Sequence, residues 1–341
     1  MVAAVGTMAV FMSKRNEAMA EIVRLKAPGG VEQLQLTRAE LPPLGSSEVR
    51  LRQTAIGVNF IDIYQRTGLY PPPPAAILGV EAVGVVEAVG ADVTGFAVGA
   101  RVAYAGAPVG AYASARNLPA WRAVKLPDEL SDEAVAASFV KSITAHMLLR
   151  RIFPVETGTR VLVHAAAGGL GQLLTRWAVH LGATVIGTVG SEAKAAIARA
   201  AGAHHVIVGR DVDFARTVSE LTNGRGVDVA YDGIGGTTLQ KTIACVRPFG
   251  VVASIGQAAG SIPPLDVEEL GPRRSLIFAR PSVMAYMNDA ADYRAAADAV
   301  LAALASGELE GTGTAYRLRD VAQAHADLEA GRTSGALYLK P

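Results

Sequence analysis

A glycine-rich turn, Ala165 to Gly171, holds the residues best suited to chemistry. Such a turn lets the main chain approach a pyrophosphate closely, and the amide groups that begin a following helix point toward its negative charge. The usual dinucleotide pattern is G-x-G-x-x-G, and Ala166 takes the place of its first glycine here. We therefore expect a pyrophosphate to be bound by Ala167, Gly168, Gly169, Leu170 and Gly171.

The residues on either side give the turn the setting that this chemistry needs. The apolar stretch Arg160–Ala165 is typical of a strand, and apolar side chains recur at helical spacing after the turn. Those side chains are Leu170, Leu173, Leu174, Trp177, Ala178 and Leu181. Gly182 ends the helix, and the next strand begins at Thr184. This order predicts a dinucleotide site, and an ordinary loop is the alternative.

The residues after the second strand, Thr184–Val189, indicate which dinucleotide is bound. A chain that binds NAD usually places an acidic residue there, where it bonds the ribose 2′-hydroxyl. Gly190 and Ser191 occupy the position instead, and Lys194 and Arg210 follow nearby. Small residues with cations close by favour a 2′-phosphate, so we predict NADPH. The alternative is that both cations are solvated surface charges.

The chain offers little for a metal site. Cys245 is the only cysteine, which excludes an internal disulfide and any zinc site with two or more thiolates. We expect it to be a small buried residue. The histidines show no metal-ligand spacing; we expect His164 to shape the end of its strand and His180 and His325 to lie at the surface. We predict no bound metal.

The bulk properties are those of a globular enzyme. The chain has 341 residues, of which 50% are apolar and 18% charged, enough for one large domain or two medium ones. A formal net charge of +1 provides no general field for nucleic acid or an anionic membrane. The segment Met1 to Met12 is apolar and is followed by the charged residues Lys14 and Arg15. A secretory signal has the opposite order, so we interpret residues 1–18 as a loose N-terminal extension.

The rest of the chain shows two different sequence patterns. From Ala20 to about Ala123, short strands and turns predict a bent antiparallel β domain. From about Leu130, helical patterns alternate with apolar strands, which predicts a parallel sheet with helices on both faces. The expected strands are 160–165, 184–189, 205–208, 227–232, 250–255 and 276–279. Ser131–Arg151 and Ala290–Ala305 are expected to be helical, and the tail 318–339 to return to the first domain.

With these features, the chain resembles the zinc-free quinone oxidoreductases related to zeta-crystallin, within the medium-chain dehydrogenase/reductase superfamily. The segments that carry the resemblance are 57–71, 137–144, 164–171, 231–232 and 280–282. It implies an α/β fold with a GroES-like domain over 19–143 and 284–341, a Rossmann domain over 144–283, and a cofactor cleft between them. Zinc-dependent relatives carry a G-H-E motif, but Val80 replaces its histidine, and Asn59 lies where a cysteine ligand is otherwise found.

The resemblance also implies roles for individual residues. Asn59 is expected near the nicotinamide, with Tyr64 and Tyr70 lining the substrate cleft. The residues expected around the cofactor are Lys141, Thr144, Gly168, Gly169 and Gly171; Gly190, Ser191 and Lys194 at the 2′-phosphate; Gly256, Gln257, Ala279, Arg280 and Pro281 at the nicotinamide half; and Arg332. Close relatives often carry a tyrosine after the third strand, where this chain has Gly209, which removes one support for NADPH selectivity.

Hydride transfer to a quinone or an α,β-unsaturated carbonyl builds charge on oxygen, and a nearby donor stabilises it. Tyr64 and Tyr70 are the best side-chain donors, with Asn59 orienting the substrate. The alternatives are that Tyr70 packs on Pro71–Pro74 and that Tyr64 belongs to the core.

The sequence thus predicts an NADPH-dependent, zinc-independent quinone reductase. Two alternatives remain open: a reductase of the C=C bond of enones, enals or enoyl thioesters, and a cofactor-binding structural or RNA-binding protein. We predict a cytoplasmic protein with no membrane or nucleic-acid partner. We also predict a homodimer formed through an apolar edge strand at Leu276–Ala279.

Overall fold

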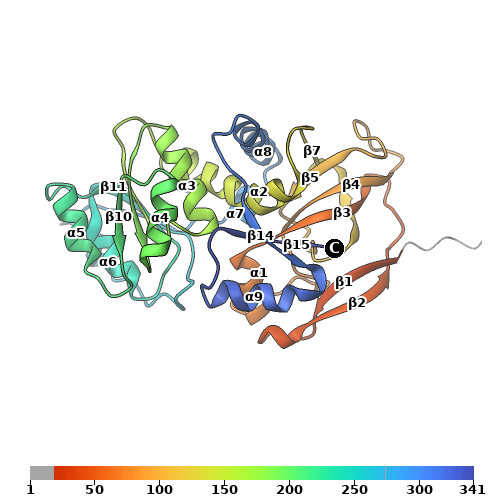
Figure 1. Cartoon of the computed structure of the whole chain (residues 1–341), viewed down its shortest axis with the longest axis horizontal. Coiled ribbons are helices and arrows are strands. Elements are labelled where there is room, and N and C mark those ends of the chain that lie inside the picture. Colours follow the sequence, from red (N-terminus) through yellow and green to blue (C-terminus); the bar gives the residue numbers. More distant parts are fainter. Residues whose placement is uncertain (1–18, 273) are drawn as a thin grey trace, which may run out of the picture.

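In the computed structural model, two large sheets lie toward opposite ends of the long axis of the molecule (Figure 1). The structure describes residues 19–272 and 274–341, so the predicted extension over 1–18 lies outside the described residues. One sheet is mainly antiparallel and the other is parallel, which confirms the predicted α/β fold class.

The antiparallel half is built around the long strand β3. Val49 and Leu51 of this strand are buried and Arg52 is exposed, the alternation of a half-buried strand. The sheet runs in the order β14-β15-β3-β4-β5-β7, with β6 also paired to β3 and a separate ribbon of β1 and β2. The strands are β1 (Met19–Leu25), β2 (Leu34–Glu40), β3 (Glu48–Val58), β4 (Glu81–Val89), β5 (Arg101–Ala105), β6 (Ala115–Pro119), β7 (Val124–Lys125), β14 (Gly313–Arg317) and β15 (Ala336–Lys340).

The parallel half follows the predicted strands closely. Its sheet has the order β10-β9-β8-β11-β12-β13, and every neighbouring pair is parallel. Three strands match their predicted limits, while β12 begins earlier and β8 ends earlier than expected. The strands are β8 (Arg160–Val163), β9 (Thr184–Val189), β10 (His205–Val208), β11 (Val227–Asp232), β12 (Val246–Ser254) and β13 (Ile277–Ala279). The predicted apolar edge strand is β13, at one end of the sheet.

The helices connect and cover the two sheets. They are α1 (Phe60–Thr67), α2 (Asp132–His146), α3 (Gly169–His180), α4 (Glu192–Ala200), α5 (Phe214–Leu221), α6 (Thr238–Cys245), α7 (Val283–Tyr286), α8 (Ala290–Ala305) and α9 (Val321–Glu329). A π-helical segment, Met147–Ile152, extends α2, and short 3-10 helices span 31–33, 120–122, 267–269 and 318–320. Among the described residues, none of these helices is both long and apolar enough to cross a bilayer.

Helix α1 was not foreseen in the predicted β region. Its inward face carries Asp62, Gln65 and Arg66, all buried, beside Ile63 and Tyr64. Because polar residues occupy positions that apolar residues usually fill, the apolar periodicity of a helix is hidden. The prediction of strands and turns alone between Ala20 and Ala123 was therefore wrong at this segment.

Helix α2 joins the two halves. It packs against β3 and β4 on one side and against α3 on the other, and most of its residues are buried. One apolar core runs through this junction, from Val83 and Ala105 past Phe139 to Val163 and Leu173. The last strand, β15, returns to pair with β3, and Figure 1 shows the C-terminal elements among the strands of the first half. The tail thus returns to the first half of the molecule, as predicted, whereas the expected limits at 143/144 and 283/284 fall within α2 and α7.

Candidate active site

The glycine turn leaves β8 and enters α3 with the backbone that a phosphate group requires. Ala165 adopts a left-handed conformation (φ 51°), and Gly168 lies at the N-cap of α3 without a side-chain cap. The first amide groups of the helix are thus left without a capping side chain. A methyl group at Gly171 would overlap the carbonyl oxygen of Ala165, and one at Gly169 would lie 3.1 Å from Cδ of Lys141. This cradle fits a pyrophosphate.

The other residues predicted at the turn face the interior. Ala167 is buried, and its carbonyl oxygen accepts hydrogen bonds from Nε2 of Gln172 (2.9 Å) and from the amide of Gly335 (3.2 Å). Leu170 packs against the core that joins the two halves. The main chain of the turn, rather than these side chains, is what a pyrophosphate would meet.

Two cations converge beyond the end of β9. Ser191 caps α4, and its Oγ accepts from the amide of Lys194 (3.4 Å). Nζ of Lys194 donates to the carbonyl oxygen of Gly331 (2.9 Å), and a methyl group at Gly190 would lie 3.4 Å from Nε of Arg210. Lys194 is therefore held against the loop that precedes β15, whereas Arg210 is exposed and only its position near Gly190 and Gly331 connects it to this edge.

Two further features of this edge bear on the cofactor. Gly209 has φ 126°, a backbone conformation that a tyrosine rarely adopts. Arg332 follows Gly331, but its guanidinium group is held by Asp327, with Nε 2.8 Å from Oδ1. The structure thus brings the loop of Arg332 to this edge while an acidic partner engages its side chain.

The ends of β12 and β13 meet the aromatic residues of the other half. The hydroxyl of Tyr64 accepts a hydrogen bond from the amide of Gln257 (3.0 Å), and its ring stands edge-on to Tyr70 with centroids 5.2 Å apart. Arg280 ties the strand ends together by donating to Oγ of Ser254 (2.7 Å). Gly256 and the segment Ala279 to Pro281 adjoin these residues.

Tyr64 keeps its phenolic proton available at neutral pH. Burial raises its pKa above the ordinary value of 10.0. Because the oxygen already accepts from the amide of Gln257, its proton is left to donate to another group.

A buried polar cluster lies between α1, β4 and α2. The side-chain amide of Asn59 donates to Oε1 of Glu81 (2.8 Å), and Nζ of Lys141 donates to the carbonyl oxygen of Val58 (3.2 Å). Nζ of Lys141 also lies 3.7 Å from Oε1 of Glu81. Burial raises the pKa of Glu81 and lowers that of Lys141, and the attraction between the two groups opposes both shifts.

The hydroxyl of Thr144 donates a hydrogen bond to the carbonyl oxygen of Val140, one turn earlier on α2 (2.8 Å). Its hydroxyl is therefore engaged by the main chain of α2.

A second buried chain of groups runs from α1 to α9. Oδ2 of Asp62 accepts from the amide of Asn59 (2.8 Å) and from the hydroxyl of Tyr112 (3.0 Å), which also lies 2.9 Å from Nε2 of His325. Burial raises the pKa of Asp62 to about 7 and lowers that of His325 to about 3. The prediction that His325 lies at the surface was wrong, because α9 packs this side on α1 and Tyr112. His180 is exposed, as predicted.

His164 stabilises the sheet beneath the glycine turn. Its Nδ1 lies 2.8 Å from Oγ1 of Thr188, and its Nε2 lies 2.9 Å from Oγ1 of Thr242. Thr242 donates to Oδ2 of Asp232 (2.7 Å), whose Oδ1 accepts from the amides of the following loop. His164 thus fixes a strand end, as predicted, and Asp232 shapes the next loop.

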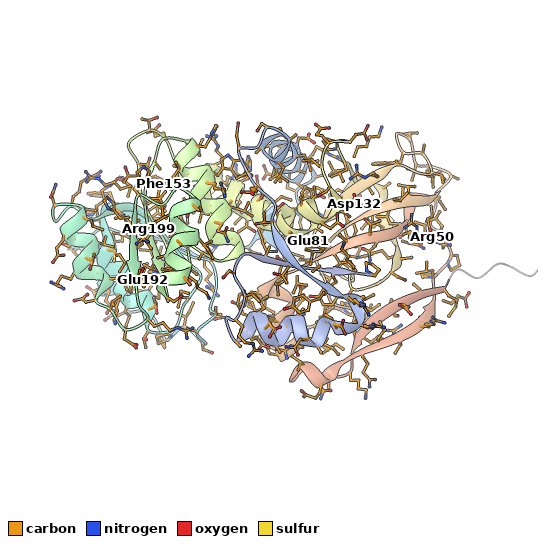
Figure 2. The ribbon with its side chains drawn as sticks, in the orientation of Figure 1. Arg50, Glu81, Asp132, Phe153, Glu192 and Arg199 are labelled. Carbon is orange, nitrogen blue, oxygen red and sulfur yellow. The ribbon has the colours of Figure 1, made fainter. Side chains whose placement is uncertain are left out.

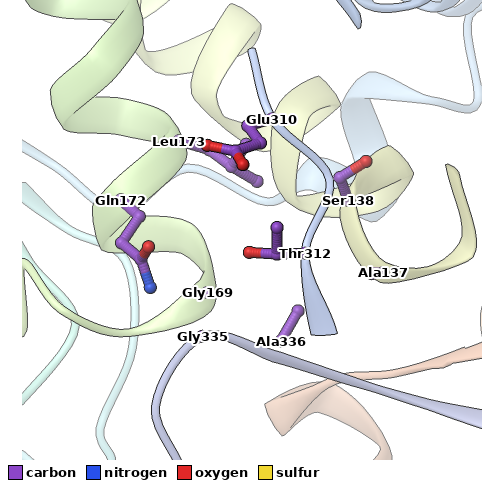
Figure 3. A pocket seen from close by; sticks show the side chains of 9 residues that line it. All are labelled: Ala137, Ser138, Gly169, Gln172, Leu173, Glu310, Thr312, Gly335 and Ala336. Carbon is purple, nitrogen blue, oxygen red and sulfur yellow. The ribbon is translucent and has the colours of Figure 1, made fainter. Parts of the chain in front are cut away.

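A small cavity separates the turn from the C-terminal segment (Figure 3). Its volume is about 10 Å³, room for one water molecule. Figure 3 shows α2 and α3 on two sides of it, with Thr312, Gly335 and Ala336 of the C-terminal segment completing the wall. This cavity is too small for a nicotinamide or a quinone and belongs to the joint between the halves.

The residues where zinc-dependent relatives hold a metal do not fit zinc here. Asn59 is engaged by Glu81, and Val80 is fully buried. Cys245 is buried, as predicted, and its thiol donates to the carbonyl oxygen of Lys241 (3.3 Å). Over residues 19–272 and 274–341, no group of three or more His, Cys, Asp or Glu side chains could hold a metal ion.

Comparison with known proteins covers nearly the whole chain. The family described as "Zinc-binding dehydrogenase" matches residues 169–302, and that described as "Alcohol dehydrogenase GroES-like domain" matches residues 45–128. The chain is 42% identical to a 2-haloacrylate reductase of Burkholderia over 95% of this chain and 99% of the relative. It is 40% identical to a quinone oxidoreductase of Pseudomonas aeruginosa over 95% of this chain and 100% of the relative.

Solved structures agree with these sequence matches. A quinone oxidoreductase of Pseudomonas syringae superimposes with a TM-score of 0.91 at 42% identity, covering 94% of this chain and 100% of its own. The quinone oxidoreductase of Escherichia coli complexed with NADPH superimposes with a TM-score of 0.90 at 37% identity, with the same coverage.

Proposed function

The chain belongs to the quinone oxidoreductases of the medium-chain dehydrogenase/reductase superfamily, and from this premise we propose how it reduces a quinone with NADPH and without zinc. The observation that carries the proposal is the position of Tyr64. Its hydroxyl accepts from the amide of Gln257, which follows β12, and we propose that the ends of β12 and β13 border the nicotinamide. We propose that this phenol, rather than a metal ion, stabilises the negative charge that grows on the substrate oxygen.

The cofactor is NADPH, which supplies a hydride when bound. We propose that its pyrophosphate lies on the first turn of α3, at Gly168, Gly169 and Gly171, because no side chain caps these amides. We propose Lys194 and Arg210 for the 2′-phosphate, since Lys194 lies in the first turn of α4, Arg210 follows β10 beside Gly190, and positions 190 and 191 carry no carboxylate.

The residues of the chain then act on the substrate. Addition of a hydride to a quinone gives a monoanion that must take up one proton, and negative charge grows on oxygen during the transfer. Tyr64 donates a hydrogen bond to that oxygen, and its raised pKa keeps it protonated. Tyr70, edge-on to Tyr64, closes the same side of the cleft, and Asn59 orients the ring.

An absorbance assay tests the proposal. Purified protein is mixed with NADPH or NADH, and oxidation of the cofactor is followed at 340 nm against a panel of ortho- and para-quinones. We expect oxidation of NADPH with at least one quinone and slower oxidation of NADH. Measurable binding of NADPH without oxidation by any acceptor would refute the proposed activity, and equal use of NADH would refute the cofactor preference.

A second candidate reaction is reduction of an activated C=C bond. The 2-haloacrylate reductase at 42% identity favours it, because charge also grows on oxygen when a hydride adds to an α,β-unsaturated carbonyl. Including 2-chloroacrylate and simple enones in the same assay separates the two reactions: a higher kcat/KM for these acceptors than for every quinone assigns the chain to C=C reduction.

We further propose a homodimer formed through β13. This strand is at the edge of the parallel sheet, and Ile277 on it is 56% exposed. An apolar edge with unpaired main-chain groups tends to pair with a second copy. Light scattering should give twice the mass of one chain, and Ile277→Lys should lower it; a monomer before substitution would refute the dimer. The cytoplasmic location stays a prediction.

A further inference from the structure

We propose that Glu81 is a positioning residue for the reduction: its one carboxylate holds the amide of Asn59 and the ammonium group of Lys141 in the orientation that the cleft requires. The inference rests on the proposed function, because it assigns Glu81 to the same site. In the sequence, Glu81 is the last residue of the segment Gly79-Val80-Glu81, which corresponds to the G-H-E motif.

Both oxygens of Glu81 are engaged. Oε1 accepts from Nδ2 of Asn59 (2.8 Å) and lies 3.7 Å from Nζ of Lys141. Oε2 accepts from the amide of Val140 (2.7 Å), in the middle of α2. Figure 2 places Glu81 at the middle of the molecule, where β4 begins near α2. One side chain thus connects the β3–α1 junction, β4 and the helix that joins the two halves.

The fold makes room for this carboxylate. A methyl group at Gly57 would overlap Oε1 of Glu81, so glycine is required there for space rather than for an unusual backbone conformation. The pairing of Ile56 with Ala82 between β3 and β4 sets Gly57 and Asn59 beside Glu81. An isolated buried carboxylate is strongly destabilising unless it is paired and hydrogen-bonded. An apolar residue would fill an interior position at lower cost, so the role of Glu81 lies in its contacts.

The contacts of Glu81 determine the orientation of the Asn59 amide and the charge state of Lys141. A carboxylate accepts hydrogen bonds and donates none, so the Asn59 amide must turn its nitrogen toward Glu81 and its oxygen away. Lys141 shares the same oxygen, and the negative charge favours the ammonium form that burial alone opposes. Glu81 therefore sets the orientation of one cleft residue and the charge of the other, without contacting a substrate itself.

The direct test compares Glu81→Gln with the wild-type protein and two further variants. Gln keeps the size of the side chain but removes the charge and lets the Asn59 amide rotate. We expect kcat for a quinone to fall about tenfold to a hundredfold with little change in the Kd for NADPH. Glu81→Asp, which keeps the charge, should recover part of the loss. Asp228→Asn is the matched control, because Asp228 is a buried, ion-paired carboxylate remote from the cleft.

Two further measurements separate positioning from a structural role. In Glu81→Gln the alkaline limb of the kcat–pH profile should move to lower pH, because Lys141 loses its counter-ion. In the background of Asn59→Ala, adding Glu81→Gln should cost much less than it does alone, since one of its partners is already gone. If Glu81→Gln does not fold, the double variant Glu81→Gln/Lys141→Met, which removes both charges, provides the same comparison against Lys141→Met alone.

The outcomes are distinct. A folded Glu81→Gln variant with kcat within twofold of wild type, or losses that add fully to those of Asn59→Ala, would overturn the positioning role. The wild-type protein in the same assay tests the proposed function separately: if it oxidises NADPH with quinones while Glu81→Gln is unchanged, the reductase stands and only the role of Glu81 fails.

Discussion

The glycine turn and the cluster of Asn59, Glu81 and Lys141 are built from different kinds of groups. The turn is built from main-chain groups within one short segment. Its glycines matter because a side chain at these positions would overlap neighbouring atoms. The cluster is built from charged and amide side chains on three elements, with Asn59 and Glu81 separated by 22 residues and joined only by folding. A site made from a local backbone is visible in the sequence, whereas a site made from buried side chains depends on tertiary structure.

The largest effect on cofactor binding is expected at Gly171, where the turn has no room for a side chain. Gly171→Ala would push a methyl group into the carbonyl oxygen of Ala165, displacing the start of α3. A clash of this kind costs about 1–3 kcal/mol. We expect the Kd for NADPH, measured by fluorescence quenching, to rise roughly tenfold to a hundredfold. Gly29→Ala is the control, because only the flexible side chain of Gln33 lies nearby. An unchanged Kd would separate the turn from the cofactor.

Selectivity for the 2′-phosphate should follow Lys194. A charge-assisted hydrogen bond contributes about 1.5–3 kcal/mol, so Lys194→Ala should raise the KM for NADPH roughly tenfold or more while leaving NADH nearly unchanged. Arg199→Ala, an exposed cation on the same helix, serves as the control (Figure 2). Equal losses for both cofactors would remove Lys194 from the 2′-phosphate site.

The catalytic half should respond in kcat rather than in cofactor binding. Tyr64→Phe removes the hydroxyl that meets Gln257, and we expect kcat for quinones to fall about tenfold with the Kd for NADPH little changed. Tyr338→Phe is the control, since Tyr338 is a buried tyrosine on β15 whose ring lies under the ammonium group of Lys340. If Tyr64→Phe leaves kcat unchanged, the tyrosine belongs to the core and is not the donor.

The pH dependence of stability involves two buried groups whose contributions have opposite signs. The raised pKa of Asp62, from 3.8 to about 7, means that the folded state holds a proton that the unfolded state releases, so this group stabilises less as pH rises from 4 to 7. The lowered pKa of His325, from 6.5 to about 3, has the opposite sign, and its contribution grows as pH rises from 3 to 6.5.

In the wild-type protein the pH dependences from Asp62 and His325 cancel in the free energy of unfolding, and single variants should reveal each one. Relative to wild type, Asp62→Asn should make the free energy of unfolding rise with pH between 4 and 6.5, and His325→Gln should make it fall, each by up to about 1.4 kcal/mol per pH unit. Urea denaturation at several pH values measures both slopes. Parallel profiles for wild type and both variants would contradict the assignment.

The contrast also explains what could be predicted from the sequence. The strands of the parallel sheet, α8 and the setting of the glycine turn follow from local periodicity, so their positions were predicted closely. Helix α1 and the burial of His325 were missed because Asp62, Gln65 and Arg66 occupy an inward face that apolar residues usually fill. Glu81 left one signal, a lone carboxylate in the apolar run Ile77 to Val86, but its partners on α1 and α2 appear only in the folded chain.

The central claim is that NADPH and a metal-free cleft suffice for the reduction. Its most direct test is the rate of NADPH oxidation by a para-quinone after exhaustive dialysis against a chelator, with the zinc content of the same sample measured. We predict that kcat is unchanged when less than one zinc ion per ten chains remains. Loss of activity on chelation, restored by added zinc, would contradict the account.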